Sequence, residues 1–154
     1  MCYIICVRIF ARIHTGAILK NSDKPILPIS LNDIQHQMMI GGLLGDSHLG
    51  QGRKDYIRLK IDRQYRDLPY LEWQYNLYKD CCSSGIREYT KEDKRYNTNY
   101  KYCSFRTRGV PAFIDYYNKW YGSGTRQVPE DIEFTPLILA VWFADDGCML
   151  MMAA

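Results

Sequence analysis

The sequence predicts an α+β protein whose strands form an antiparallel sheet. Alternation of apolar and polar residues marks strands at 56–64, 86–93 and 99–108, and apolar residues at helical spacing mark segments around them. The strands come in neighbouring pairs rather than in alternation with crossover helices, which excludes a doubly wound parallel sheet. The predicted order is helix, two strands, helix, two strands, helix, helix.

Composition places the chain among soluble globular proteins. Its 154 residues suit one domain, with 47% hydrophobic and 24% charged residues. No apolar run approaches the roughly 18 residues of a membrane span, so no membrane partner is expected. The six cysteines form no Cys-x-x-Cys pair and the three histidines lack the spacing of a zinc site. We therefore expect reduced thiols and no zinc-finger or disulfide scaffold.

Charge is distributed unevenly along the chain. Residues 51–108 hold fourteen Lys and Arg against eight Asp and Glu, whereas residues 109–154 hold two against six. A basic middle followed by an acidic end suits a polyanion-binding surface beside a cation-binding site. Ordinary variation of surface charge is the alternative reading of this pattern.

The first predicted helix follows the proline-punctuated stretch 24–30. Ser30–Asp33 has the form of a capping box, and Ile34, Met38, Gly41 and Gly45 then follow at spacings of three and four. Glycine costs about 1 kcal/mol relative to alanine inside a helix, so several glycines close together need a reason. Close approach of a second backbone is the expected one.

The middle of the chain predicts two hairpins separated by a helix. Residues 48–56 and 56–64 give a first antiparallel pair, in which Ile57, Leu59 and Ile61 form the apolar face. Residues 67–82 show helical spacing, with Pro69 near the helix start. Residues 86–93 and 99–108 give the second pair, with polar and basic side chains on one face.

Two more helices complete the pattern. Residues 110–121 form a short helix that a Gly-Ser-Gly stretch ends, and residues 125–134 form a connector. Thr135 followed by Pro136 is typical of a helix start, and the helix that follows runs to about residue 147. Ala140 and Ala144 give this last helix a small face, which is expected to pack against the glycines of the first helix.

Both the first and the last of these helices end on a carboxylate. The C-terminal end of a helix carries about half a negative charge, so an acid is unfavourable there without a compensating cation. Asp46 ends the first helix and the pair Asp145-Asp146 ends the last. Singly, each acid can be explained as a turn residue. Two such endings in one chain indicate a site.

These segments resemble the motif of a known family. "MIGGLLGDS" at 39–47 and "LAVWFADDG" at 139–147 resemble the two motif copies that name the LAGLIDADG homing endonucleases. The intervening elements resemble that family's αββαββα half-domain, here followed by the second motif helix. The "TRQVPEDIEFTP" connector also resembles that of the family. The resemblance covers about residues 30–147.

The resemblance implies a metal-dependent site where the two motif helices end. By motif position, Asp46 and Asp146 would hold Mg²⁺ or Mn²⁺, and Gly45 and Asp145 would contribute backbone carbonyls. Magnesium takes hard oxygen ligands, often only one or two carboxylates. The implied reaction is hydrolysis of DNA phosphodiesters. The family's active-site lysine falls at Arg126, which keeps the charge but is a poor proton acceptor, and which could also be an ordinary linker charge.

The resemblance also implies that the polar face of the sheet reads double-stranded DNA. A two-stranded ribbon fits the major groove, where Arg and Lys can pair with guanine edges. Any one of the basic residues could be a phosphate contact or a solvated charge. The prediction therefore rests on the whole set of residues on this face. The predicted DNA-binding residues are Arg58, Lys60, Arg87, Tyr89, Lys91, Tyr102, Ser104 and Arg106.

The expected domain plan is a poorly patterned segment at 1–29, a half-domain at 30–124, and the connector with the second motif helix at 125–154. The remaining strands of a second half-domain are expected to be missing, so a second chain could complete the domain. The functional expectation is an intron-homing endonuclease in an organelle, the mitochondrion rather than the chloroplast. The alternatives are an RNA-binding splicing maturase that binds intron RNA, an inactive remnant, and a plain basic nucleic-acid-binding module.

Overall fold

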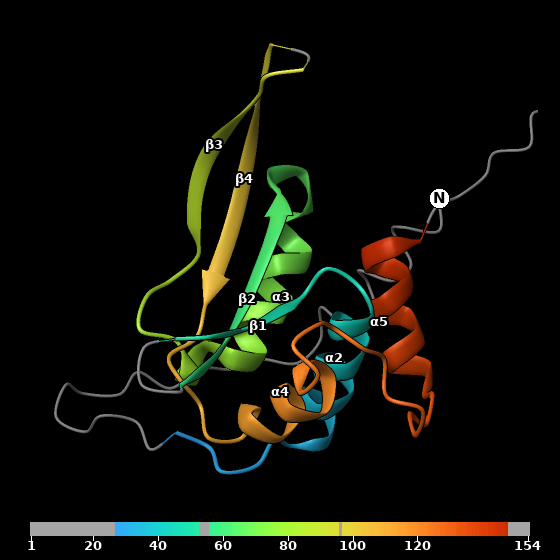
Figure 1. Ribbon diagram of the computed structural model, residues 1–154. Helices are drawn as coiled ribbons and strands as arrows, with labels where there is room; N and C mark the ends of the chain where they lie inside the picture. The colour runs from blue at the N-terminus through green and yellow to red at the C-terminus, as the bar shows by residue number, and fades with distance from the viewer. Residues whose placement is uncertain (1–26, 53–55, 96, 148–154) are drawn as a thin grey trace, which may run out of the picture.

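The computed structural model describes residues 27–52, 56–95 and 97–147 (Figure 1). Most of the predicted N-terminal segment 1–29, and all residues after 147, lie outside the described residues. Within the described part, no helix is long and apolar enough to cross a membrane.

The first helix, α2, spans Asp33–Leu44 and begins two residues later than the sequence pattern suggested. Its capping box is formed by Asn32 and Gln35, not by Ser30 and Asp33. The Asn32 side chain accepts from the Gln35 amide at 2.9 Å, and the Gln35 side chain accepts from the Asn32 amide at 3.1 Å. The exchange satisfies two amides at the helix start, and Asn serves the cap as well as Ser does.

The four strands form one antiparallel sheet, as predicted. They are β1 (His48–Gln51), β2 (Ile57–Gln64), β3 (Arg87–Asp93) and β4 (Thr98–Arg106), in the spatial order β1-β2-β4-β3. Residues on β2 alternate between buried and half-buried along the whole strand. One face of the sheet is therefore covered, and the other is open.

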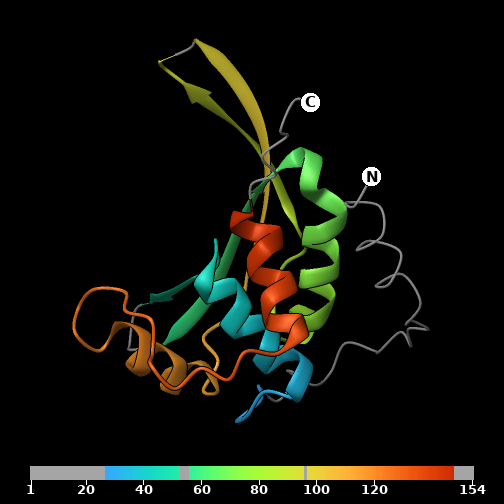
Figure 2. The same ribbon diagram turned by 90° about the vertical axis from the view of Figure 1, so that its right-hand side faces the viewer.

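Helices cover one face of this sheet. The short turn η2 (Tyr65–Asp67) leads into α3 (Leu68–Tyr78), which η3 (Lys79–Cys81) extends, and α4 (Phe113–Tyr121) packs near β1 and β2. The helices α2 and α3 lie against that face, and α5 (Pro136–Asp146) packs against α2 farther from the sheet (Figure 1). Figure 2 shows the β3–β4 hairpin projecting beyond the helices. The fully buried side chains include Met38, Met39, Leu43, Leu49, Leu59, Ile61, Leu71, Tyr78, Phe105, Phe113 and Trp120.

The helices α2 and α5 lie in contact through the predicted glycine face. A Cβ placed on Gly41 would lie 2.8 Å from the carbonyl oxygen of Ile138, so only glycine lets the two backbones approach this closely. On α5 the contact is made by Ile138 and Val141, both buried, while Ala144 is exposed. The predicted small face is thus wrong at Ala144, whereas Ala140 is half-buried. The room left by Gly41 admits a valine on the partner helix.

Candidate functional site

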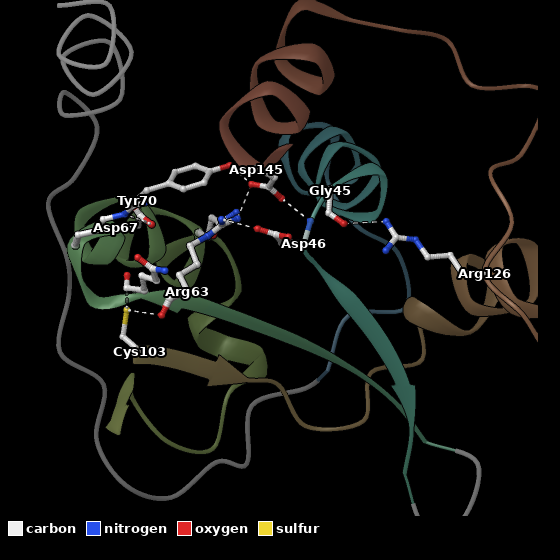
Figure 3. Close-up of polar contacts among 11 residues, drawn as sticks. Gly45, Asp46, Arg63, Asp67, Tyr70, Cys103, Arg126 and Asp145 are labelled. Carbon is white, nitrogen blue, oxygen red and sulfur yellow. Dashed lines mark hydrogen bonds and ion pairs between the residues drawn. The ribbon is translucent and has the colours of Figure 1, made fainter. Parts of the chain in front are cut away.

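The C-terminal ends of α2 and α5 meet, which brings residues about one hundred positions apart into contact. The backbone N–H of Asp46 donates to Asp145 Oδ2 at 3.1 Å (Figure 3). A Cβ on Gly45 would lie 2.7 Å from that same Asp145 oxygen, so the absence of a side chain at Gly45 makes room for the Asp145 carboxylate. The two helix ends therefore fit each other through different residues, a glycine on α2 and a carboxylate on α5.

Arg63, near the end of β2, joins both helix ends. Its side chain is only 5% exposed, and its guanidinium lies 2.5 Å from Asp145 Oδ1 and 3.6 Å from Asp46 Oδ2. Arg63 Nε donates to Gln74 Oε1 at 2.9 Å, and the guanidinium stacks over the Tyr70 ring at 4.4 Å from the ring centroid. A buried charge needs such partners, because burial without them is costly.

The side chain of Asp145 is fully buried and held by several donors. Besides Arg63 and the Asp46 amide, the Tyr70 hydroxyl donates to Asp145 Oδ1 at 3.1 Å. Burial raises the pKa of Asp145, and Arg63 and these hydrogen bonds oppose that rise. The sequence assigned only a backbone carbonyl to this position, whereas the structure gives the side chain a place inside the protein.

Asp46 and Asp146 present carboxylates at the surface beside this network. The Asp46 side chain is 51% exposed, and Asp146 is exposed. Partial burial raises the pKa of Asp46; the charges of Arg63 and Arg126 lower it, and that of Asp146 raises it. The two acids thus lie near enough to interact, at the foot of two packed helices.

Arg126 lies at the same end of the helices. It comes from the connector between α4 and α5, and its Nη2 donates to the carbonyl oxygen of Gly45 at 2.9 Å. A carbonyl oxygen has a second lone pair, so this bond leaves Gly45 able to accept another partner. The predicted residues Asp46, Asp146, Gly45 and Arg126 are therefore gathered in one region.

The open face of the sheet carries all eight residues predicted to contact DNA. Cross-strand partners share a face in an antiparallel sheet, and Lys60 pairs with Arg106, Arg87 with Ser104, and Tyr89 with Tyr102. The face holds a hollow of about 550 Å³. The predicted residues that line this hollow are Arg58, Lys60, Arg87, Tyr89, Ser104 and Arg106.

Two polar contacts hold part of this face in place. Asp62 accepts from Lys60 Nζ at 2.7 Å and from the Tyr89 hydroxyl. The Tyr89 and Tyr102 rings stack with centroids 5.7 Å apart, and Lys91 Nζ lies 5.4 Å from the Tyr102 centroid. A basic and aromatic surface of this kind suits a polyanion with planar bases.

Comparison with known protein families identifies the family that has this arrangement of helices and sheet. The model of the LAGLIDADG DNA endonuclease family matches residues 36–152, which include both acid-ended helices and the whole sheet. The chain belongs to this family. Membership accounts for the two motif helices and for the antiparallel sheet between them.

Individual relatives of this LAGLIDADG chain differ in kind. It is 26% identical over 146 residues to the cytochrome b mRNA maturase bI2 of Saccharomyces cerevisiae, covering 85% of this chain and 33% of the maturase. It is 28% identical over 125 residues to the RecA protein of Mycolicibacterium flavescens, covering 78% of this chain and 27% of that protein. The chain therefore spans a third or less of the length of these relatives.

A solved homing endonuclease structure shares the fold. The homing endonuclease I-WcaI bound to its DNA recognition sequence superposes with a TM-score of 0.68 at 20% identity, covering 76% of this chain and 52% of that one. This likeness confirms the predicted α+β architecture with its antiparallel sheet.

LAGLIDADG nucleases use divalent metals, and the exposed acids of this chain fit such an ion. Asp46 and Asp146 offer carboxylate oxygens, the hard ligands that Mg²⁺ and Mn²⁺ accept, and Gly45 adds a carbonyl oxygen. Among the described residues there is no cluster of three or more His, Cys, Asp or Glu side chains suited to a metal. A two-carboxylate set therefore suits an ion that takes its other ligands from water and phosphate.

Sequence reasoning missed Arg63, Tyr70 and Gln74 in this LAGLIDADG site. A signal was present for Arg63, because it continues the alternation of the buried positions Leu59 and Ile61 on β2. A charged residue in phase with core positions indicates a buried partner of opposite charge. Gln74 has a similar signal, because it is polar and lies at helical spacing from the buried Leu71 and Tyr78. Nothing comparable marks Tyr70, which is half-buried.

Proposed function

We propose that this chain is a site-specific double-strand DNA endonuclease of the intron-homing type. Asp46 and Asp146 hold Mg²⁺ or Mn²⁺, with Gly45 and Asp145 adding backbone carbonyls. Such an ion supplies a bound water of lowered pKa and stabilises charge on the attacking and leaving oxygens of a phosphodiester. Arg126 supports the phosphate with a charge that stays protonated.

The observation that carries this proposal is the meeting of the α2 and α5 ends beside a basic sheet. The contact between the Asp46 amide and Asp145 brings the two motif acids to the same place. The open sheet face then offers Arg58, Lys60 and Arg106 to the phosphates and base edges of DNA. Metal-assisted cleavage of DNA needs carboxylates that hold a cation and basic side chains that hold the DNA.

The test is magnesium-dependent cleavage of DNA spanning the gene's own insertion site. The unaltered chain is compared with Asp46→Asn, and with Asp33→Asn as a matched control. Asp33 lies at the other end of the same helix and is exposed, so the same substitution there changes no site residue. Cleavage that Asp46→Asn abolishes and Asp33→Asn leaves intact supports the proposal; equal cleavage by all three refutes a role for Asp46.

A splicing maturase is the second candidate, because cytochrome b mRNA maturases are among the relatives. The basic sheet face would then bind intron RNA, and neither motif acid would be needed. Splicing of the host intron that survives Asp46→Asn but fails when Arg58 and Arg106 are both replaced by Gln favours this function. The same relatives support an organellar location, in the mitochondrion rather than the chloroplast.

We also propose that a second chain covers the outer side of α5. Leu139, Trp142 and Phe143 are exposed there, and Phe134 stacks on Trp142 with centroids 6.2 Å apart. Exposed apolar side chains gathered on one helix are typical of an interaction surface. Sedimentation of the chain and of Phe143→Ser tests this: a dimer that the variant dissociates supports a second copy, and two monomers refute it.

A further inference from the structure

Arg63 and Asp145 form a buried ion pair directly beside the exposed Asp46. The Arg63 side chain is 5% exposed and that of Asp145 fully buried, with 2.5 Å between guanidinium and carboxylate (Figure 3). Neither side chain is assigned a part in the proposed reaction. A buried pair of this kind is costly to build, so its position beside a motif acid calls for an explanation.

Arg63 cannot move away from Asp46. Its Nε donates to Gln74, and its guanidinium lies on the Tyr70 ring, so β2 and α3 both fix it in place. The planar guanidinium has donors on all sides and cannot lose its charge. A permanent positive charge therefore lies 3.6 Å from Asp46 Oδ2.

That charge alone would oppose binding of a divalent cation at Asp46. Like charges repel, and the repulsion is stronger in a partly buried site than in water. The Asp145 carboxylate lies closer to Arg63 than Asp46 does, and it accepts from Arg63 rather than merely facing it. The positive charge is thus neutralised on the side that faces away from solvent.

We propose that Asp145 is a positioning residue that serves as the counter-ion of Arg63, so that Asp46 stays free to hold a divalent cation. The Asp145 side chain is not a ligand of that cation. It also holds the Asp46 backbone through the amide that donates to Oδ2. This inference rests on the proposed function, since it takes Asp46 as a cation ligand.

The test is the affinity for Mn²⁺, measured by electron paramagnetic resonance without DNA. Asp145→Asn leaves Arg63 to pair with Asp46, and we expect about tenfold weaker Mn²⁺ binding. Arg63→Gln should not weaken binding. The double variant Arg63→Gln/Asp145→Asn removes both charges, so no positive charge is left at position 63 to pair with Asp46. Its affinity should return to within about threefold of the unaltered chain.

The double variant separates the two roles of Asp145. If the Asp145 side chain ligates the cation, the double variant stays as weak as Asp145→Asn, and the inference is overturned. Asp46→Asn in the same assay addresses the proposed function itself. Binding that Asp46→Asn leaves unchanged would refute the proposed cation site, whereas a double variant that fails to recover would refute only the counter-ion role.

A measurement on the unaltered protein covers the case in which a substituted chain fails to fold. The Arg63 Nε–H has a buried bond to Gln74, and the Asp46 amide donates to the buried carboxylate of Asp145. Both should therefore give slowly exchanging proton signals in nuclear magnetic resonance spectra. Saturating Mg²⁺ should leave both protected. Loss of the Asp46 amide's protection on adding Mg²⁺ would mean that the ion takes the Asp145 carboxylate to which this amide donates, and would overturn the inference.

Discussion

The helices α2 and α5 end at the same place but present different groups there. At the end of α2, Gly45 has no side chain and Asp46 faces solvent. At the end of α5, Asp145 fills the space that Gly45 leaves, and Asp146 faces solvent. Equivalent motif positions thus have unequal surroundings. The exposed acid of each helix is accessible to a cation. The residue before it, Gly45 on α2 and Asp145 on α5, determines how the two helices fit together.

The largest expected effect is on the exposed acids. Asp46→Asn and Asp146→Asn should each lower the rate of DNA cleavage roughly a thousandfold, because under the proposed function each removes a cation ligand that stabilises the transition state by several kcal/mol. Single-turnover cleavage measures this. Similar losses would show that the two exposed acids are equivalent; a loss at one acid alone would show that the asymmetry extends to catalysis.

The next effect concerns the fit between Gly45 and Asp145. Gly45→Ala should lower the free energy of unfolding by about 2–3 kcal/mol, because the new Cβ would overlap the Asp145 side chain. Gly85→Ala is the matched control, since nothing lies within 4 Å of a Cβ at that position. Urea unfolding of both variants measures the difference. Equal stability of the two would contradict a tight fit at the helix ends.

A smaller effect is expected at Tyr70. Tyr70→Phe keeps the ring under Arg63 but removes the hydroxyl that donates to Asp145, and should cost about 1.5 kcal/mol of stability. Tyr100→Phe on the open sheet face serves as control, because it loses the same atom at an exposed position. Thermal unfolding of the two variants distinguishes them; an unchanged Tyr70→Phe would mean that Arg63 and the Asp46 amide hold Asp145 without help from the Tyr70 hydroxyl.

The smallest effect separates binding from catalysis. Arg106→Gln should weaken DNA binding by about 1 kcal/mol and reduce the salt dependence by about one charge, with the helix ends unaffected. Lys119→Gln is the control, since Lys119 lies on α4 in an exposed ion pair with Asp131. Filter binding at several salt concentrations measures both. An equal change in the two variants would argue against a specific role of the sheet face.

The fold was largely predictable because its signals are local. Alternation placed the strands, and the glycines of α2 indicated a close helix contact. The identity of the contacting residues on α5 was not predictable: Ile138 and Val141 make it, whereas the alanines fitted the spacing equally well. Which side of a helix faces its neighbour depends on the neighbour's shape, and no pattern within one helix contains that information.

The candidate site was predictable only in part, for a similar reason. Asp46 and Asp146 were identified by motif position, and their gathering follows from the helix contact. The buried network was missed for two reasons. Asp145 belongs to an acidic pair and so resembles surface charge in the sequence, whereas the position of Arg63 in phase with Leu59 and Ile61 indicates burial but not its partner. Their partners come from β2, α3 and α5, so only the folded chain brings Arg63, Tyr70 and Asp145 together.

The β3–β4 hairpin extends past the helices, and most of its outer residues are exposed on both faces (Figure 1). A substitution on its outer half therefore removes few core contacts and should cost little stability. In evolutionary terms, this arm can accumulate sequence changes while the helix pair and its acids stay fixed. Drift toward new target sites would begin there.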